Sequence, residues 1–411
     1  MAVTAWHPRW VLLVAVVLAS LLAFTGVAGA ESEKKRKRQF TVSEAMGKKL
    51  VRAQEAMAED RWADATKALE TSEKRADRGR LTAHERALVY QFLSLIEAQQ
   101  QQYPTALVYM EKCLAQDGLS DKTQLSVMFN VAQIHLALEQ YPLAVRALDR
   151  WFENTETPTS QGYYLLAAAY YQQEQLDRAL EPARKAVEIA TAPNQSWLQL
   201  LVGLYLGKER YADALPHVEA LATNFPKKSY YAQLSALYGM LDQDEKSLAV
   251  MQLSYEQGFL TSDRELRRLG SMYLYLGLPQ RAATFMDKLI AEQKVEVDAK
   301  SLELLANSRI VARDLDKAID PLARAAAMSE QGDVYVRLGQ IYLEREDWDA
   351  ASDALSKGLE RGVKKEGNAQ LLLGIAYYNQ SEPKNARRAF RAARKFKDSR
   401  KSALRWIEML D

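Results

Sequence analysis

Apolar residues recur along the chain at helical spacing, and a small residue returns in every second helical run. It usually stands three places after an aromatic residue, Leu or Pro, and successive copies lie 33 to 41 residues apart. The series is Ala65, Ala106, Ala144, Ala179, Ala214, Ser247, Ala282, Ala318, Ala351 and Ala386. No strand-like alternation separates these positions, so the pattern predicts an array of helical repeats.

The repeat unit is clearest around Ala351, which follows Leu338-Gly339 and Tyr342 at fixed distances, and the same spacing recurs before Ala386. This spacing is typical of tetratricopeptide repeats (TPRs), which are hairpins of two antiparallel helices. The small residues are expected where the two helix axes cross, since only a short side chain lets the backbones approach there. A single hairpin cannot bury its apolar face, so neighbouring hairpins must stack.

We therefore predict an all-α fold, a TPR superhelical solenoid of about ten helix-turn-helix repeats over residues 41–411. Wider spacing between the first anchors, Ala65 and Ala106, predicts longer helices or inserted turns there. Pro226 is expected to follow the end of a second helix. The segment Ser399–Asp411, with Leu404, Ile407 and Leu410 at three-residue spacing, predicts a terminal helix that closes the exposed end of the stack.

Charge and composition narrow the class of partner. The 411 residues include 55 Lys and Arg and 53 Asp and Glu. No Pro/Gly/Ser-rich linker interrupts residues 41–411, which favours one continuous array. We find no basic stripe within the repeats of the kind that nucleic-acid binding requires, and therefore expect no nucleic-acid partner.

The first forty residues predict export. An apolar run from Trp10 to Val27 precedes Ala28-Gly29-Ala30, the pattern of a signal peptide over residues 1–30 with a mature start at Glu31 and a basic tail over 31–40. This interpretation predicts a periplasmic protein. The run is also about long enough to span a bilayer.

The basic residues Lys34–Arg38 follow that run, while only Arg9 precedes it, which by the positive-inside rule favours an uncleaved anchor with a cytoplasmic body. Both alternatives stay open. The same basic residues are a candidate contact with a membrane surface.

A search for catalytic patterns gives none. His84-Glu85 begins a zinc-protease motif, but Leu88 occupies the position of the second ligand. There is no glycine-rich phosphate loop and no nucleophile elbow. We expect no enzyme activity, no metal and no cofactor, and we expect the single cysteine, Cys113, to be a packing residue.

The candidate binding surface is the side of each first helix that faces away from its hairpin, which lines the concave face of a TPR superhelix. Its predicted residues include Phe129, Gln133, Tyr164, Tyr171, Gln172, Gln199, Arg264, Arg267, Tyr275, Asn307, Gln340, Asn368, Tyr378 and Asn379. This lining is rich in Tyr, Gln and Asn, which suits an extended peptide. The ordered Lys and Asn set of a carboxylate clamp is absent.

Several stretches resemble one group of TPR proteins. They are KKRKRQ (34–39), DGLS (117–120), RWFENT with YYLLAAAYYQ (150–172), FPKKSYYAQLSALYGMLDQDEKSLAVMQLSYEQGFLT (225–261) and LRRLGSMYLYLGLPQRAA (266–283). The chain is similar in these stretches to the periplasmic TPR proteins that accompany TonB–ExbB–ExbD energy-transduction systems. The resemblance implies a non-enzymatic adaptor in TonB-dependent uptake, such as iron-siderophore import, with TonB, ExbB or ExbD as partners. A membrane-anchored assembly factor of the cell envelope, facing the cytoplasm, is the alternative.

Overall fold

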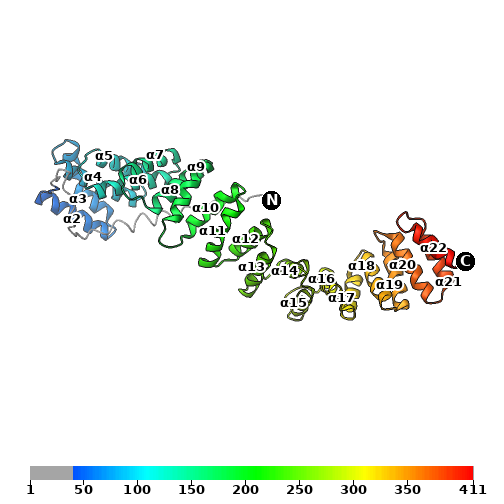
Figure 1. The fold of residues 1–411 in the computed structure, drawn as a ribbon. Coiled ribbons are helices and arrows are strands. Elements are labelled where there is room, and N and C mark those ends of the chain that lie inside the picture. The colour runs from blue at the N-terminus through cyan, green and yellow to red at the C-terminus, as the bar shows by residue number, and fades with distance from the viewer. Residues whose placement is uncertain (1–39, 411) are drawn as a thin grey trace. The chain divides into compact units, whose positions relative to one another are not determined.

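The structure, a computed structural model, describes residues 40–410, which form 21 α-helices and no β-strand (Figure 1). Twenty of them pair as ten successive hairpins. The first helices are α2 (Glu44–Ala58), α4 (Ala83–Gln99), α6 (Asp121–Ala137), α8 (Ser160–Gln172), α10 (Gln195–Gly207), α12 (Lys228–Met240), α14 (Asp263–Tyr275), α16 (Ala299–Val311), α18 (Asp333–Glu344) and α20 (Glu366–Asn379). The second helices are α3 (Trp62–Asp77), α5 (Tyr103–Leu114), α7 (Tyr141–Asn154), α9 (Leu176–Glu188), α11 (Tyr211–Asn224), α13 (Asp244–Glu256), α15 (Pro279–Ala291), α17 (Leu315–Met328), α19 (Trp348–Arg361) and α21 (Pro383–Ala393). A last helix, α22 (Arg400–Leu410), follows them.

The array divides into two compact units, one ending at Asn224 and the other starting at Phe225. The first unit contains the five hairpins from α2 to α11, and the second contains the five from α12 to α21 together with α22. The boundary falls at the end of α11, where Pro226 follows the helix as predicted.

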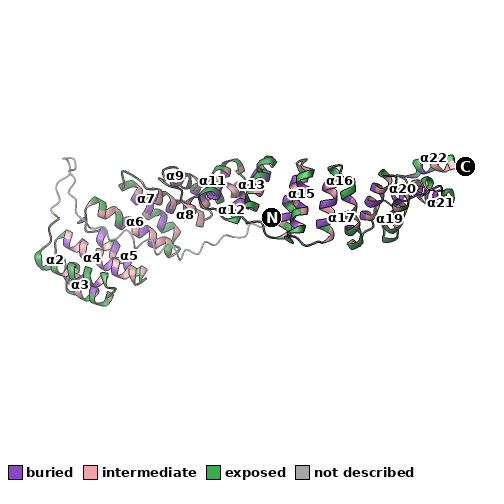
Figure 2. Ribbon diagram, turned by 90° about the horizontal axis from the view of Figure 1, so that it is seen from below, coloured by how far each residue is buried: buried purple, intermediate pink, exposed green. Residues whose placement is uncertain are grey.

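The ten small anchor residues all lie in second helices and are all buried. The nine alanines of the series are each 0% exposed, and Ser247 is 4% exposed. In both units the buried residues face the paired helix and the neighbouring hairpins, whereas the exposed residues face outward (Figure 2). The predicted repeat number and the all-α TPR fold are therefore confirmed.

Close packing explains why the anchors must be small. A Cβ atom on Gly339 in α18 would lie 2.6 Å from Leu355 Cγ in α19 and 3.4 Å from the carbonyl oxygen of Ala351. Gly339 and Ala351 thus meet where the two helices cross. Any side chain at position 339, or one larger than alanine at position 351, would push the helices apart.

Every hairpin turn contains one residue with a left-handed backbone, five residues before the small anchor residue of its repeat. These residues are Asp60, Gln101, Glu139, Glu174, Glu209, Asp242, Gly277, Arg313, Glu346 and Ser381. Only one of the ten is glycine, although positive φ is costly for other residues. Asp242 is one of these turn residues, and Asp244 begins the next helix, α13.

The early hairpins are longer than the later ones, as their spacing predicts. Helix α3 has 16 residues and helix α4 has 17, whereas α14, α15 and α16 each have 13. The additional residues account for the wider interval between Ala65 and Ala106.

Helix α22 packs on α21, and of the three apolar residues at three-residue spacing, Ile407 and Leu410 are half-buried. Ala403 is the residue of α22 that is fully buried, and the Trp406 ring stacks on Phe390 with 5.3 Å between ring centroids. Leu404 is 37% exposed. The predicted cap is therefore present, and Ala403 and Trp406 lie on its inner side.

Ser247, the one anchor that is not alanine, has a buried hydrogen-bond partner. Its Oγ lies 2.8 Å from the Ser235 carbonyl oxygen and 3.0 Å from Ser235 Oγ. We expect Ser247→Ala alone to lower the free energy of unfolding by about 1–2 kcal/mol, since it removes one partner of a buried pair, and Ser235→Ala/Ser247→Ala to cost less. Urea unfolding checks this order, with the exposed Ser271→Ala as control. A double variant less stable than the single one would contradict it.

Candidate functional site

Helix α14 presents a polar face to solvent. At 100° per residue, Arg264, Arg268, Ser271 and Tyr275 fall on one side of the helix, and all four are exposed. The opposite side carries its buried residues, including Leu269. Tyr275 is 71% exposed, and none of these four side chains has an ion-pair or hydrogen-bond partner within residues 40–410. We call the corresponding exposed side of α12, α14, α16 and α18 the first-helix face.

An apolar row crosses the ends of three of these helices. Met240, Tyr275 and Val311 are the last residues of α12, α14 and α16, and they are 56%, 71% and 57% exposed. They occupy the same position of three successive repeats in the second unit. Exposed apolar side chains at equivalent positions are typical of an interaction surface.

Polar contacts join the neighbouring first helices and hold this face in place. Lys228 Nζ lies 2.7 Å from Glu265 Oε1, which links α12 to α14. Arg267 donates to Ser301 Oγ at 3.1 Å and lies 3.2 Å from Asp298 Oδ2, which links α14 to α16.

The next link joins α16 to α18. Arg337 donates to Asn307 Oδ1 at 2.8 Å and pairs with Glu303. Of the predicted binding residues, Arg267 and Asn307 are therefore engaged between repeats. Arg264, Tyr275 and Gln340 are exposed on the same face.

In the first unit the predicted binding residues are partly covered. Phe129 packs against the Trp151 ring at 5.2 Å, and Tyr164 lies 6.1 Å from the Trp197 ring. Burial raises the pKa of Tyr164. Phe129 is thus a packing residue that reaches the surface with only part of its ring.

The other predicted residues differ in exposure. Gln133, Tyr171, Gln172, Gln199 and Asn368 are half-buried. Tyr378 and Asn379 are exposed, but the Tyr378 ring contacts Trp406 of α22 at 5.2 Å. The binding role of all these residues stays a prediction.

The Lys228–Glu265 contact gives a pH-dependent test. The hydrogen bond from Lys228 is the largest cause that lowers the pKa of Glu265, to about 2. Because the pKa is lower in the folded chain than the value of about 4.3 in an unfolded one, this contact stabilises the fold above that value and is lost as pH falls towards 2. We expect Lys228→Met to raise the pKa of Glu265, measured by carbon-detected NMR titration. Lys300→Met, which removes a cation that does not contact Glu265, should leave it unchanged; an unshifted pKa in Lys228→Met would contradict the assignment.

The described residues contain no cluster that could hold a metal ion. No group of three or more His, Cys, Asp or Glu in residues 40–410 is arranged for a metal ion. His84 Nδ1 lies 2.7 Å from the Gly118 carbonyl oxygen, and His217 stacks on Tyr205. Cys113 is buried, which raises its pKa to about 12 and confirms its packing role.

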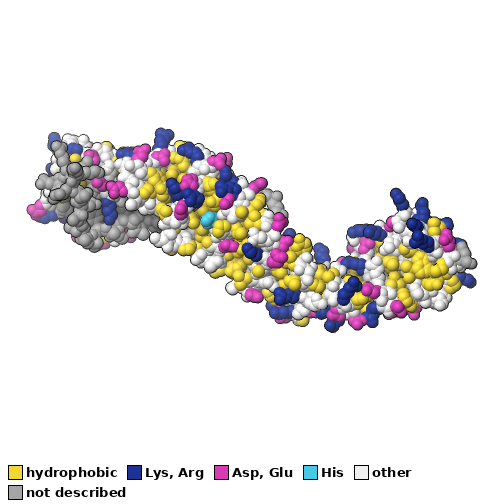
Figure 3. Space-filling view, viewed as in Figure 1, with side chains coloured by type: hydrophobic (Ala, Val, Ile, Leu, Met, Phe, Trp, Pro, Cys, Tyr) yellow, Lys and Arg dark blue, Asp and Glu magenta, His cyan; other side chains and the backbone are white. Residues whose placement is uncertain are grey.

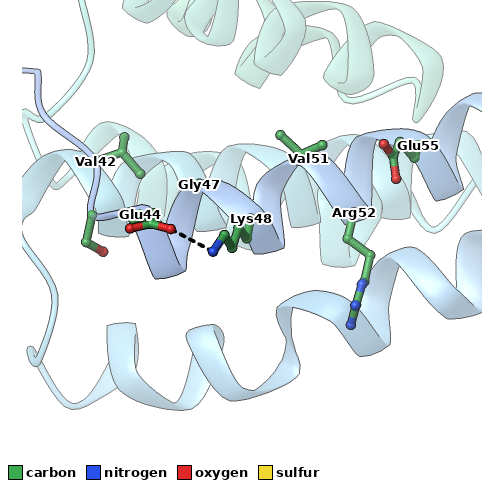
Figure 4. Close-up of a pocket in the computed structure, with 8 residues that line it drawn as sticks. Val42, Glu44, Gly47, Lys48, Val51, Arg52 and Glu55 are labelled. Atoms are coloured by element: carbon green, nitrogen blue, oxygen red, sulfur yellow. Dashed lines mark ion pairs between the residues drawn. The ribbon is translucent and has the colours of Figure 1, made fainter.

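One open hollow of about 500 Å³ runs along α2. Figure 4 shows that its lining side chains come from α2 and the residues just before it, with an ion pair between Glu44 and Lys48. Because one helix supplies the whole lining, the hollow is a shallow surface groove. It brings together no set of groups suited to chemistry.

The predictions for the N-terminus lie outside the described residues. They include the signal peptide, the cleavage site before Glu31 and the membrane contact of Lys34–Arg38. Among residues 40–410, no helix combines the length and the hydrophobicity that crossing a bilayer requires.

Sequence reasoning missed a basic surface at the end of the array. Figure 3 shows Lys and Arg side chains gathered beside the segment that joins α21 to α22. Residues 384–405 contain ten Lys and Arg and one acidic residue, Asp398. The statement that the repeats carry no basic stripe is therefore wrong for the last repeat. A count of charges in a sliding window would have found it, whereas the nearly balanced total conceals it.

Comparisons with known proteins agree with the fold. A tetratricopeptide repeat family model matches residues 130–195 and 336–400. A comparison with curated proteins found no match.

Similar solved structures include MamA, which is 21% identical over 41% of this chain and 96% of its own, with a TM-score of 0.36. YrrB, described as a TPR protein with an unusual peptide-binding site, is 18% identical over 46% of this chain and 88% of its own, with a TM-score of 0.36. A tetratricopeptide repeat protein from Parabacteroides merdae is 17% identical over 61% and 98%, with a TM-score of 0.31.

The ten hairpins, their buried anchors and the matched repeats define the class: this is a TPR solenoid, a scaffold of the type that binds protein or peptide partners. The matched family model is a repeat model. TPR proteins are generally non-enzymatic scaffolds.

Proposed function

We propose that this protein is an adaptor that binds an extended protein segment on the first-helix face of its second unit. The observation that carries the proposal is the row Met240, Tyr275 and Val311, exposed at equivalent positions of three repeats. Apolar side chains of a bound segment would pack on this row. Arg264 and Arg268 would pair with its acidic groups or its carbonyl oxygens.

The polar links between first helices support this assignment because they reduce the conformational entropy that the first-helix face loses when a partner binds. Arg267 and Arg337 fix α14, α16 and α18 relative to one another before a partner arrives. A preformed surface loses less conformational entropy when it binds.

A photo-crosslinking amino acid at Tyr275 of the full-length protein, expressed in its own host, tests the proposal. We expect a crosslinked protein partner that is lost in Met240→Ser/Val311→Ser. The matched control is Leu253→Ser/Met328→Ser, which removes two exposed apolar side chains from second helices. Equal crosslinking in both variants would contradict the assignment of the site.

We further propose that the adaptor acts in the periplasm as an accessory of a TonB-dependent transport system. The support is the sequence resemblance over 225–261 and 266–283, together with the apolar run that ends at Ala28-Gly29-Ala30. The supporting result is crosslinked TonB, ExbB or ExbD together with a mature chain that starts at Glu31.

The alternative, a membrane-anchored assembly factor that faces the cytoplasm, rests on the basic residues Lys34–Arg38 after the apolar run. Mass spectrometry of the same crosslinked sample separates the two. Cytoplasmic partners and an intact Met1 segment would overturn the periplasmic proposal and favour this one.

A further inference from the structure

The cations of this chain are concentrated at its C-terminal end. Outside residues 384–405 the sequence holds 45 Lys and Arg and 52 Asp and Glu, so the remainder is slightly acidic. The ten basic residues of this segment are Lys384, Arg387, Arg388, Arg391, Arg394, Lys395, Lys397, Arg400, Lys401 and Arg405. All but Arg387, which is half-buried, are exposed.

Helix α21 arranges part of this charge as a stripe. Lys384, Arg388 and Arg391 follow one another at intervals of four and three residues, so they project from one side of the helix, and Lys395 follows two residues beyond its end. The opposite side is buried and includes Phe390. The stripe therefore carries about one positive charge per helical turn.

Nine of these ten cations have no acidic partner among residues 40–410. Apart from Arg387, none of the ten forms an ion pair with any residue in the range 40–410. Elsewhere in the chain, exposed cations such as Arg184 pair with neighbouring carboxylates on their own helix. An unneutralised cluster of this size attracts an anionic surface.

Apolar side chains lie beside the cations on the cap helix. Leu404 is 37% exposed and Met409 is 55% exposed, and both belong to α22 together with Arg400, Lys401 and Arg405. Trp406, stacked on Phe390, holds the helix against α21. Exposed cations beside exposed apolar residues are the surface that an interfacial helix presents to lipid head groups.

We propose that the basic surface of α21 and α22 binds the surface of an anionic phospholipid bilayer. Clusters of four to eight basic residues bind acidic lipids by charge, and Leu404 and Met409 would enter the head-group region. A nucleic-acid backbone would use the cations but leave these apolar residues without a role. The basic residues Lys34–Arg38 of the same chain would be repelled by this basic surface, so they are not its binding partner. In the sequence they follow an apolar run, so sequences near both ends of the chain carry features suited to a bilayer.

The test uses the full-length protein with a fluorescent probe on the cap. Ser402 is exposed on α22, and the native thiol at Cys113 is buried, so Ser402→Cys can be labelled selectively with an environment-sensitive dye. Vesicles of phosphatidylglycerol and phosphatidylcholine should change the emission at low salt. Vesicles of phosphatidylcholine alone should not, and 0.5 M salt should abolish the change.

Lys384→Gln/Arg388→Gln/Arg391→Gln/Lys395→Gln, in the labelled protein, should weaken apparent binding by at least tenfold. The matched control, Arg52→Gln/Lys67→Gln/Lys122→Gln/Arg146→Gln, removes the same charge from exposed positions of the first unit and should bind normally. Because the probe reports on α22, attachment through residues 1–39 does not produce the signal. A dye at Ser126→Cys in the first unit should remain silent.

Three results would overturn the proposal. One is an equal response of the stripe variant and its control, which would mean that net charge alone matters. The second is an equal response to soluble glycerol phosphate, which would assign the surface to a small anion. The third is tighter binding of a DNA or RNA duplex than of vesicles at the same phosphate concentration.

Discussion

Replacing Gly332 with alanine is expected to destabilise the second unit by about 3 kcal/mol or more, one of the largest single effects available in the chain. A Cβ atom at this position would lie 1.9 Å from the Gly358 carbonyl oxygen and 2.8 Å from that of Gly362. Both neighbours are backbone atoms, so no side-chain rotation can relieve the overlap. The Gly332 amide also donates to the Gly362 carbonyl oxygen at 3.0 Å, and separation of the two segments would break this bond.

Gly239→Ala is the matched control for that prediction. Gly239 lies inside α12 of the same unit, and nothing is within 4 Å of where its Cβ atom would be. Alanine there should stabilise the helix by about 0.5–1 kcal/mol. Urea unfolding with hydrogen exchange on α17 to α19 measures both variants. If Gly332→Ala unfolds at the same urea concentration as the native chain, the close approach between the α18 start and the α19 end is wrong.

The fold was predictable from sequence because its determinant is local and repeated. Two helices that cross closely need small residues at the crossing, and Ala282 or Ala351 reveals that requirement without any knowledge of the neighbours. The left-handed turns were not predictable in the same way. Glu139 and Glu174 adopt positive φ although their residue type does not favour it, since the two helices on either side impose the conformation.

For the candidate site, the sequence predicts which side of each first helix is exposed, but not which residues on that side contact one another. Helical spacing places Arg264 and Tyr275 on the exposed side of α14, and the structure agrees. Spacing cannot show which exposed residues meet across hairpins, so the engagement of Arg267 with Asp298 and of Asn307 with Arg337 required coordinates.

The cap shows the same limit. Three-residue spacing fits two different sides of a short helix, and only packing against α21 decides between Leu404 and Ala403 as the inward residue. The basic surface, by contrast, required no coordinates to find.

Phe390→Ala is the second change with a large expected effect, because this ring joins the last hairpin to its cap. Phe390 is 0% exposed, stacks on Trp406 and covers Gly374, whose Cβ atom would lie 2.4 Å from Phe390 Cε1. Truncation removes a buried ring and leaves a cavity, which costs about 3–5 kcal/mol. In a repeat array each hairpin contacts mainly its neighbours, so the loss should be local.

Hydrogen exchange by mass spectrometry measures where this loss falls. Exchange should rise in α20, α21 and α22 and stay unchanged in α12 to α14, while Leu404→Ala, at an exposed position of the same cap, should change little. Faster exchange throughout the second unit would mean that its hairpins unfold as one cooperative body and that the cap stabilises all of them. In that case the lipid affinities of the α21 variants would have to be compared at equal stability of the second unit. A substitution at one end would then lower the stability of all its hairpins.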